Sequence, residues 1–147
     1  MLMDGRLRLN GALYLMDWDD IQLGWFDSSI SLLGLVDNIG KAESDGTEID
    51  LKYLVNDAVS IAVGFSENST ALKEDYTLRG VVEARDGQDL PFTPDKKYNV
   101  TINVDITDTS SFQFNNVFVD EMWNDLFYDD REMQDSYGIA NLSFTTQ

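Results

Sequence analysis

The chain has 147 residues, of which 27 are acidic and 10 basic, giving a net charge of −17. Apolar residues make up 43% and aromatic residues 12%. This excludes a disordered acidic tail, which lacks the apolar groups needed to offset the entropy of an ordered chain. The length predicts one domain over residues 1–147, with room for a core.

Cysteine and histidine are both absent from the sequence. Their absence excludes disulfides, thiolate zinc sites and histidine-dependent nucleophilic catalysis. A pair of carboxylates for glycoside hydrolysis needs a defined separation beside a cleft. With so many acids, sequence spacing selects no such pair, and we expect the protein not to be an enzyme.

The first predicted element is a hairpin over residues 6–15. Alternating leucines stand on both sides of Asn10-Gly11, the dipeptide that most favours a tight type I′ turn. A period-two pattern over 21–25 predicts a strand. The segment 37–46 is rich in Asn, Gly, Ser and Asp and is predicted to be a loop.

The clearest strands lie in the second half of the chain. Apolar and polar residues alternate over 59–65, 76–84 and 98–106, with a loop expected over 66–75. Residues 112–119 are interpreted as a second hairpin or a bulged strand, and 137–146 as the last strand. Turns every 8–12 residues predict an all-β, mainly antiparallel fold of the β-sandwich or jelly-roll-like kind. A short helix near 121–133 is an alternative to an aromatic-rich loop there.

Acidic clusters in the predicted loops are candidate Ca²⁺ sites, because this ion prefers oxygen ligands. None has the spacing of an EF-hand, and a solvated acidic surface is the favoured interpretation. Ca²⁺ is therefore the only cofactor kept open. The candidate metal ligands are Asp17, Asp19, Asp20, Asp129 and Asp130.

An aromatic run between residues 123 and 128 is a candidate contact surface. Its side chains are too apolar for a solvated loop, so either the core or a partner must cover them. We expect a protein interface formed by Trp123, Phe127 and Tyr128, with copies of the chain or other assembly subunits as partners.

Charge and hydropathy also bear on location. The longest wholly apolar stretch, 32–36, is far shorter than the roughly 20 residues of a membrane-spanning helix, and no secretory signal is visible. The negative charge disfavours direct contact with nucleic acid or with an anionic membrane. We therefore expect a virion or cytoplasmic location, with no membrane contact.

Three functions follow from these observations. The first is a non-enzymatic structural protein of a larger assembly, such as a capsid, decoration or tail component of a virion. A high-salt environment would screen its charge. The second is an acidic nucleic-acid mimic that inhibits a DNA-binding protein. The third is a carbohydrate- or calcium-binding module.

Overall fold

Strands account for most of the chain in the computed structural model, which describes residues 3–25, 34–127 and 133–146. The described residues form ten strands. Their bounds are β1 (Leu7–Trp25), β2 (Leu35–Leu54), β3 (Val59–Leu72), β4 (Tyr76–Leu78), β5 (Val81–Ala84), β6 (Lys96–Thr107), β7 (Ser110–Val119), β8 (Met122–Trp123), β9 (Met133–Gln134) and β10 (Tyr137–Thr146).

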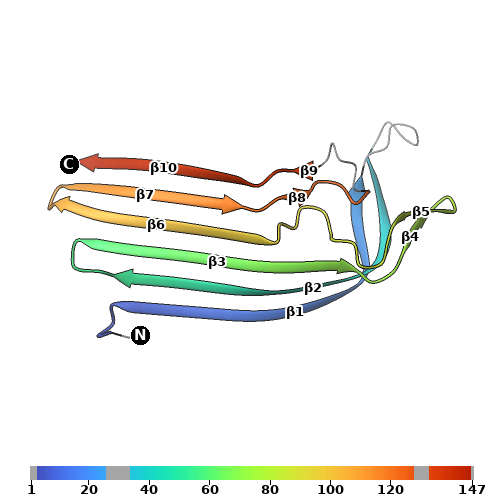
Figure 1. Ribbon diagram of the computed structural model, residues 1–147, viewed down its shortest axis with the longest axis horizontal. Helices are drawn as coiled ribbons and strands as arrows, with labels where there is room; N and C mark the ends of the chain where they lie inside the picture. Colours follow the sequence, from blue (N-terminus) through green and yellow to red (C-terminus); the bar gives the residue numbers. More distant parts are fainter. Residues whose placement is uncertain (1–2, 26–33, 128–132, 147) are drawn as a thin grey trace.

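Six of these strands form one antiparallel sheet in the order β1-β2-β3-β6-β7-β10. At one end, which we call the turn end, 55–58 joins β2 to β3 and 108–109 joins β6 to β7. At the opposite end, the loop end, the connections are longer and contain the two-stranded sheets β4-β5 and β8-β9. The chain begins and ends at the turn end (Figure 1).

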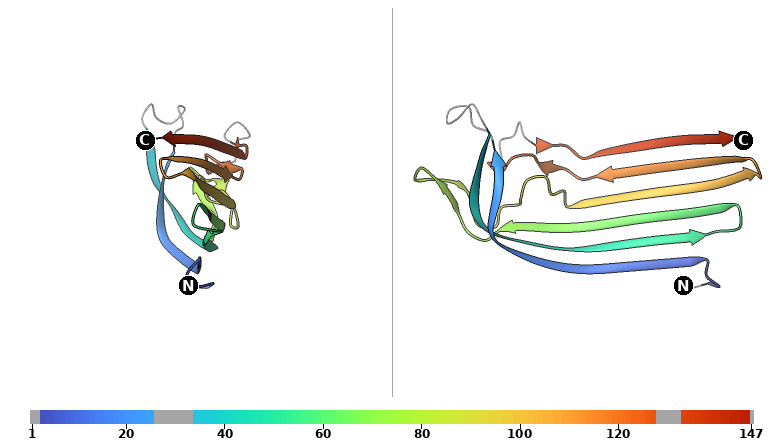
Figure 2. Two further views of the ribbon diagram at one scale, coloured as in Figure 1. Left: turned by 90° about the vertical axis from the view of Figure 1, so that its left-hand side faces the viewer. Right: turned by 180° about the vertical axis from the view of Figure 1, so that it is seen from behind.

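The two longest strands, β1 and β2, bend away from the rest of the sheet at the loop end (Figures 1 and 2). The register of β1 against β2 shifts between Trp18 and Ile21 and again between Ile21 and Gln22. Asp20 lies in this bulge with a positive φ of 57°. Because bulges bend and twist the strand that carries them, this interruption accounts for the curvature.

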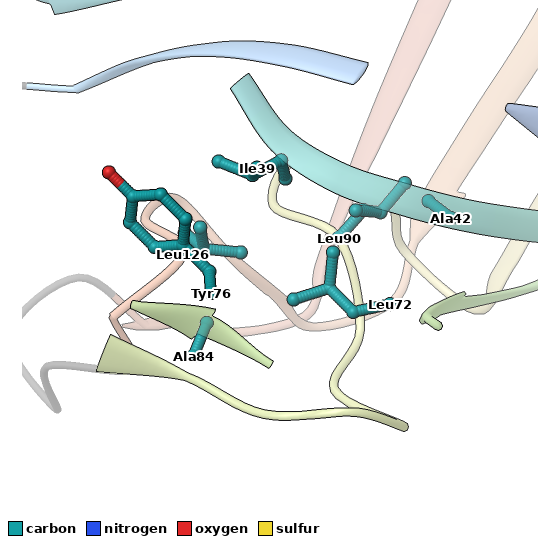
Figure 3. Packing of buried hydrophobic residues seen from close by; sticks show 7 residues of the cluster. All are labelled: Ile39, Ala42, Leu72, Tyr76, Ala84, Leu90 and Leu126. Atoms are coloured by element: carbon teal, nitrogen blue, oxygen red, sulfur yellow. The ribbon is translucent and has the colours of Figure 1, made fainter. Parts of the chain in front are cut away.

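The buried core of the described chain lies at the loop end and is small. It consists of Ile39, Ala42, Leu72, Tyr76, Ala84, Leu90 and Leu126, and we call it the buried cluster (Figure 3). These side chains come from β2, β3, the β4-β5 sheet and two connections, so one small sheet packs on the large one here. The all-β, mainly antiparallel class is confirmed, and sandwich-like packing is found at this end.

The expected hairpin at Asn10-Gly11 is wrong. β1 continues straight through this dipeptide and pairs with β2, with Asn10 opposite Asp50 and Gly11 opposite Ile49. The loop expected over 37–46 is also wrong, because these residues belong to β2. In both places long-range pairing outweighs the local turn preference of Asn, Gly and Asp.

Three further expectations are wrong in part. Residues 66–72 of the expected loop over 66–75 belong to β3, where they pair with β2. The single strand expected over 76–84 is a hairpin of β4 and β5. Residues 112–119 form neither a hairpin nor a bulge, because they lie within the continuous strand β7.

The short helix expected near 121–133 is likewise absent from the described part of that segment. Met122 and Trp123 instead pair with Gln134 and Met133. The Asp125 side chain accepts a hydrogen bond of 2.9 Å from the backbone N–H of Phe127. This local bond satisfies a donor that a helix would otherwise use, and it favours a turn. Residues 128–132 lie outside the described residues.

Candidate functional site

One face of the six-stranded sheet carries a continuous apolar surface, which we call the apolar band. The register carries it across the sheet, so that Tyr53 lies opposite both Leu7 and Ile61, and Ile102 opposite Phe114. The band consists of Leu7, Leu9, Leu13 and Leu15 on β1; Ile49, Leu51 and Tyr53 on β2; Val59, Ile61, Val63 and Phe65 on β3; Tyr98, Val100, Ile102, Val104 and Ile106 on β6; Phe112, Phe114 and Phe118 on β7; and Ala140, Leu142 and Phe144 on β10.

No side chain of the apolar band is buried by the described chain. Leu13 is 84% exposed, Leu142 70% and Phe144 63%, and the side chains on the central strands are mostly half-buried by their neighbours on the same face. The rings of Tyr98 and Phe118 stack with centroids 4.9 Å apart, which confirms that they share this face. A surface this large and apolar requires a covering.

The apolar band is bounded by charge on the side of the loop end. The next residues on this face after Phe65 and Tyr98 are Glu67 and Lys96, whose charged groups lie 3.8 Å apart. Within the band, four apolar positions two residues apart on β3 span about 20 Å along the strand. The amide of Asn116 also lies on this face and donates a hydrogen bond of 3.2 Å to the carbonyl of Ile139.

The opposite face of the sheet, which we call the polar face, is lined by amide and hydroxyl groups. Gln113 donates to the side-chain oxygen of Asn103 at 2.7 Å, and Asn103 donates to the Ser60 hydroxyl at 3.3 Å. Asn115 donates to the Thr101 hydroxyl at 3.0 Å. These cross-strand bonds use the polar half of the alternation whose apolar half forms the band.

A groove of about 520 Å³ crosses the polar face between β2 and β7. Gly64 forms part of its floor, because the Asn99 amide lies where a Cβ atom on this residue would be. Glu48, Asp50 and Lys97 line the same groove, together with the apolar side chains of Val117 and Val119.

At the loop end a hydrogen bond joins the β4-β5 sheet to the bent part of β2. The Tyr76 hydroxyl donates to a carboxylate oxygen of Asp37 at 2.7 Å. Tyr76 is only 6% exposed. Its burial, and next its hydrogen bond to the Asp37 carboxylate, raise the pKa of Tyr76 to about 12.

The structure places three of the candidate metal ligands on the bent part of β1. Asp19 forms an exposed ion pair of 3.1 Å with Lys41, and Asp20 accepts a hydrogen bond of 3.1 Å from Asn38. Asp17 lies opposite Glu43. In the described ranges no group of three or more acidic residues is arranged to hold a metal ion. Asp129 and Asp130 lie outside these ranges, and Ca²⁺ binding stays a prediction.

The structure also places two of the three candidate interface residues. Trp123 lies in β8 and is half-buried, and its carbonyl accepts a hydrogen bond of 2.7 Å from Phe92. Phe127 packs against the buried cluster. Tyr128 lies outside the described residues. Phe127 thus has a role in the chain's own core, and the interface stays a prediction.

Sequence comparison finds no relatives: neither a family model nor a curated protein matches the chain. Among the described residues no helix is long and apolar enough to cross a membrane. The fold, however, is similar to part of two solved receptors. One is the siderophore receptor PiuA from Acinetobacter baumannii (TM-score 0.73, 15% identity, 97% of this chain and 20% of that one). The other is the ferric yersiniabactin uptake receptor FyuA from Yersinia pestis (TM-score 0.71, 19% identity, 95% and 20%).

This similarity corrects the function expected from the sequence. The chain has the fold of a section of these two receptors and spans about a fifth of their length. The expected virion structural protein, with its virion or cytoplasmic location, is therefore wrong. The two alternatives, a nucleic-acid mimic and a carbohydrate- or calcium-binding module, are set aside on the same finding.

Sequence reasoning missed the apolar band because it assigned the alternating residues to a core. A signal for the band was present in the length of the alternation. A strand that alternates over about ten residues has one long apolar face, whether or not the chain itself covers that face. The residues from Tyr98 to Ile106 show this pattern, with Asn99, Thr101 and Asn103 between the apolar positions.

Proposed function

We propose that the chain forms a section of the wall of a closed β-sheet that spans a membrane, with the apolar band facing lipid. The observation that carries this proposal is the apolar band itself, a surface of apolar side chains across all six strands that the described chain leaves exposed or half-buried. Lipid would cover every strand of it at once.

The dimensions and the opposite face support the same conclusion. The outward apolar surface of a membrane-spanning sheet is about 25 Å tall, and its interior surface is polar. The apolar band extends over about 20 Å before side-chain width is added. The polar face supplies the hydroxyl and amide groups expected of a surface lining a water-filled interior.

The connections indicate which way the section faces. Membrane-spanning sheets of the outer-membrane type have short turns on the inner side and longer loops outside. The turn end would then face inward and the loop end outward. The acidic residues beyond Glu67 and Lys96 would stand in water on the outer side, away from the hydrocarbon.

The two similar structures suggest the kind of protein to which such a wall belongs. Both are receptors, one for a siderophore and one for the uptake of ferric yersiniabactin. We extend this to the chain as part of the proposal: it contributes wall to a receptor of the siderophore-uptake kind. A wall of this kind needs no catalytic step, and the expectation of a non-enzyme stays a prediction. Membrane contact replaces the earlier expectation that there is none.

Adjacent residues on β7 provide the test. Phe114 lies in the centre of the apolar band and Gln113 on the polar face. Phe114→Lys should disfavour insertion into phospholipid vesicles by about 2–4 kcal/mol, as a lysine does at the bilayer midplane. Gln113→Lys is the matched control and should insert like the unmodified chain. The inserted fraction is measured by protease protection after refolding with vesicles.

Two results would contradict the proposal. The first is a folded, monomeric chain that does not insert into phospholipid vesicles. The second is equal insertion of the two lysine variants, since lipid would then not distinguish the faces of the sheet.

A further inference from the structure

Phe92, in the connection between β5 and β6, combines an exposed ring with an unfavourable backbone conformation. The residue is 64% exposed and its φ is 60°. Among the described residues it is the only aromatic one with a positive φ. A bulky side chain disfavours this region of the backbone, and residues that are kept there cluster at ligand contacts and active sites.

The unfavourable conformation belongs to a tight turn over residues 90–93. The Thr93 hydroxyl donates a hydrogen bond to the Leu90 carbonyl across the turn, and Pro91 occupies the first of its two central positions. Phe92 occupies the second, which normally takes glycine when its φ is positive. Since glycine would suit the backbone better, the turn itself does not account for a phenylalanine here.

Contacts on both sides of Phe92 hold the turn in place. The backbone N–H of Phe92 donates a hydrogen bond of 2.7 Å to the carbonyl of Trp123 in β8. Leu90 packs in the buried cluster (Figure 3), and its N–H donates to the Thr70 hydroxyl at 3.0 Å. Pro94 is buried. The ring is therefore presented on a rigid base, which lowers the entropic cost of binding to it.

The turn lies on the side of the sheet that carries the polar face. Thr70 is an even-numbered residue of β3, like Ser60 and Gly64, and the register of β3 against β2 is continuous. Its side chain therefore points to the polar face. The Thr70 hydroxyl contacts Thr93 at 3.0 Å as well as Leu90. In the proposed wall, Phe92 would stand on the water-filled side, near the outer end, and not against lipid.

The two segments that form and support the turn are acidic. Neither 86–95 nor 119–127 contains a lysine or an arginine. Their acidic residues are Asp86, Asp89, Asp95, Asp120, Glu121 and Asp125. Negative charge here repels an anionic ligand, whereas an uncharged or cationic ligand can approach.

We propose that Phe92 is a ligand-contact residue, and that its ring stacks on a flat ring of an uncharged or cationic iron chelate. This inference rests on the proposed function, because a wall of the siderophore-uptake kind supplies the class of ligand. Stacked rings attract each other beyond the apolar area that they bury. An aromatic side chain that is held rigidly and left in water is suited to such a contact.

Three ferric complexes with different rings and charges test the proposal. Iron(III) tris(maltolate) is uncharged and carries flat rings, tris(acetohydroxamate) is uncharged without rings, and tris(catecholate) carries rings but is anionic. Each is dialysed to equilibrium against the chain refolded with vesicles, and against vesicles alone. We expect tris(maltolate) to bind about tenfold more tightly than either of the other two complexes.

Phe92→Gly separates a ligand contact from a role in the fold. Glycine suits the positive φ, so the variant should unfold at the same or a higher temperature, while its affinity for tris(maltolate) should fall about tenfold. Phe92→Tyr keeps the ring and should keep the affinity. Val81→Ala is the matched control, because it trims another exposed apolar side chain at the loop end and should leave binding unchanged.

The outcomes separate this inference from the proposed function. A chain that inserts into vesicles as Phe114→Lys and Gln113→Lys predict, yet binds tris(maltolate) equally with and without the Phe92 ring or not at all, overturns the ligand contact alone. A lower unfolding temperature of Phe92→Gly does the same, since the ring would then serve the fold. Tighter binding of tris(catecholate) overturns the proposed ligand charge. A chain that neither inserts nor distinguishes its two faces overturns the proposed function.

Discussion

The molecule has two apolar regions of opposite character. The buried cluster at the loop end is closed off by the chain itself, and Leu72 within it has no exposed surface. The apolar band is larger, spreads over six strands, and leaves Leu142 70% exposed. The buried cluster stabilises the fold of the chain, whereas the apolar band needs to be covered by something outside the described chain. Apolar content alone does not distinguish the two, but the closure of the surrounding elements does.

The largest effect that would sharpen this comparison is expected from Leu72→Ala. Removing a fully buried leucine side chain costs about 2–5 kcal/mol through lost burial and the cavity left behind. Leu142→Ala is the matched change in the apolar band and should cost much less in water, because that side chain is already exposed. Thermal unfolding and hydrogen exchange of the β4-β5 amides would measure both. Equal costs would mean that the band is covered in water as well.

A smaller effect is expected at Tyr76, which ties the β4-β5 sheet to β2. Its pKa of about 12 lies above that of an exposed tyrosine, so folding favours the neutral hydroxyl. This contribution is complete below about pH 10 and is lost as the pH rises toward 12, by no more than about 3 kcal/mol.

Tyr76→Phe separates the hydrogen bond from the burial of the ring. At neutral pH the loss of the bond to Asp37 should cost about 1 kcal/mol. Above pH 10 the variant should lack the alkaline loss that the unmodified chain shows. Denaturant unfolding between pH 7 and 11.5 would follow both effects. The same alkaline loss in the variant would assign it to other groups.

The smallest effect is expected from Asp19→Asn on the bent part of β1. The ion pair with Lys41 is solvent-exposed on both sides, and such pairs contribute little to stability. We expect an unchanged melting temperature at low and at high salt. A clear loss, or a loss of stabilisation by added Ca²⁺, would give this carboxylate a role that its exposed position does not suggest.

The sequence predicted the strands wherever apolar and polar residues alternate without competing signals. Tyr98–Ile106 and Val59–Phe65 lie within β6 and β3, as expected. The alternation of side chains between the two faces of a strand could also have corrected the hairpin expected at Asn10-Gly11. A two-residue turn there would place Leu13 and Leu15 on the face opposite to Leu7 and Leu9, whereas a continuous strand keeps all four on one face.

The rest depends on information that alternation does not carry. Residues 37–46 form a strand because β1 pairs with them and β3 pairs with the part from Ala42 onward, a long-range effect that local composition cannot predict. The alternation of β6 identifies an apolar face but not what covers it, since a core and a lipid layer select the same residues. The hydrogen bond from Tyr76 to Asp37 depends on the bend in β2, which no local motif predicts.

The β4-β5 hairpin offers a practical consequence as a display site. Its base is anchored by Tyr76 and Ala84 in the buried cluster, while its tip at Arg79-Gly80 is exposed and followed by Val81, which is 58% exposed. Exposed tips on an anchored base tolerate inserted sequence. A peptide epitope placed between Arg79 and Gly80 would be presented beyond the loop end of the sheet, where an antibody could reach it.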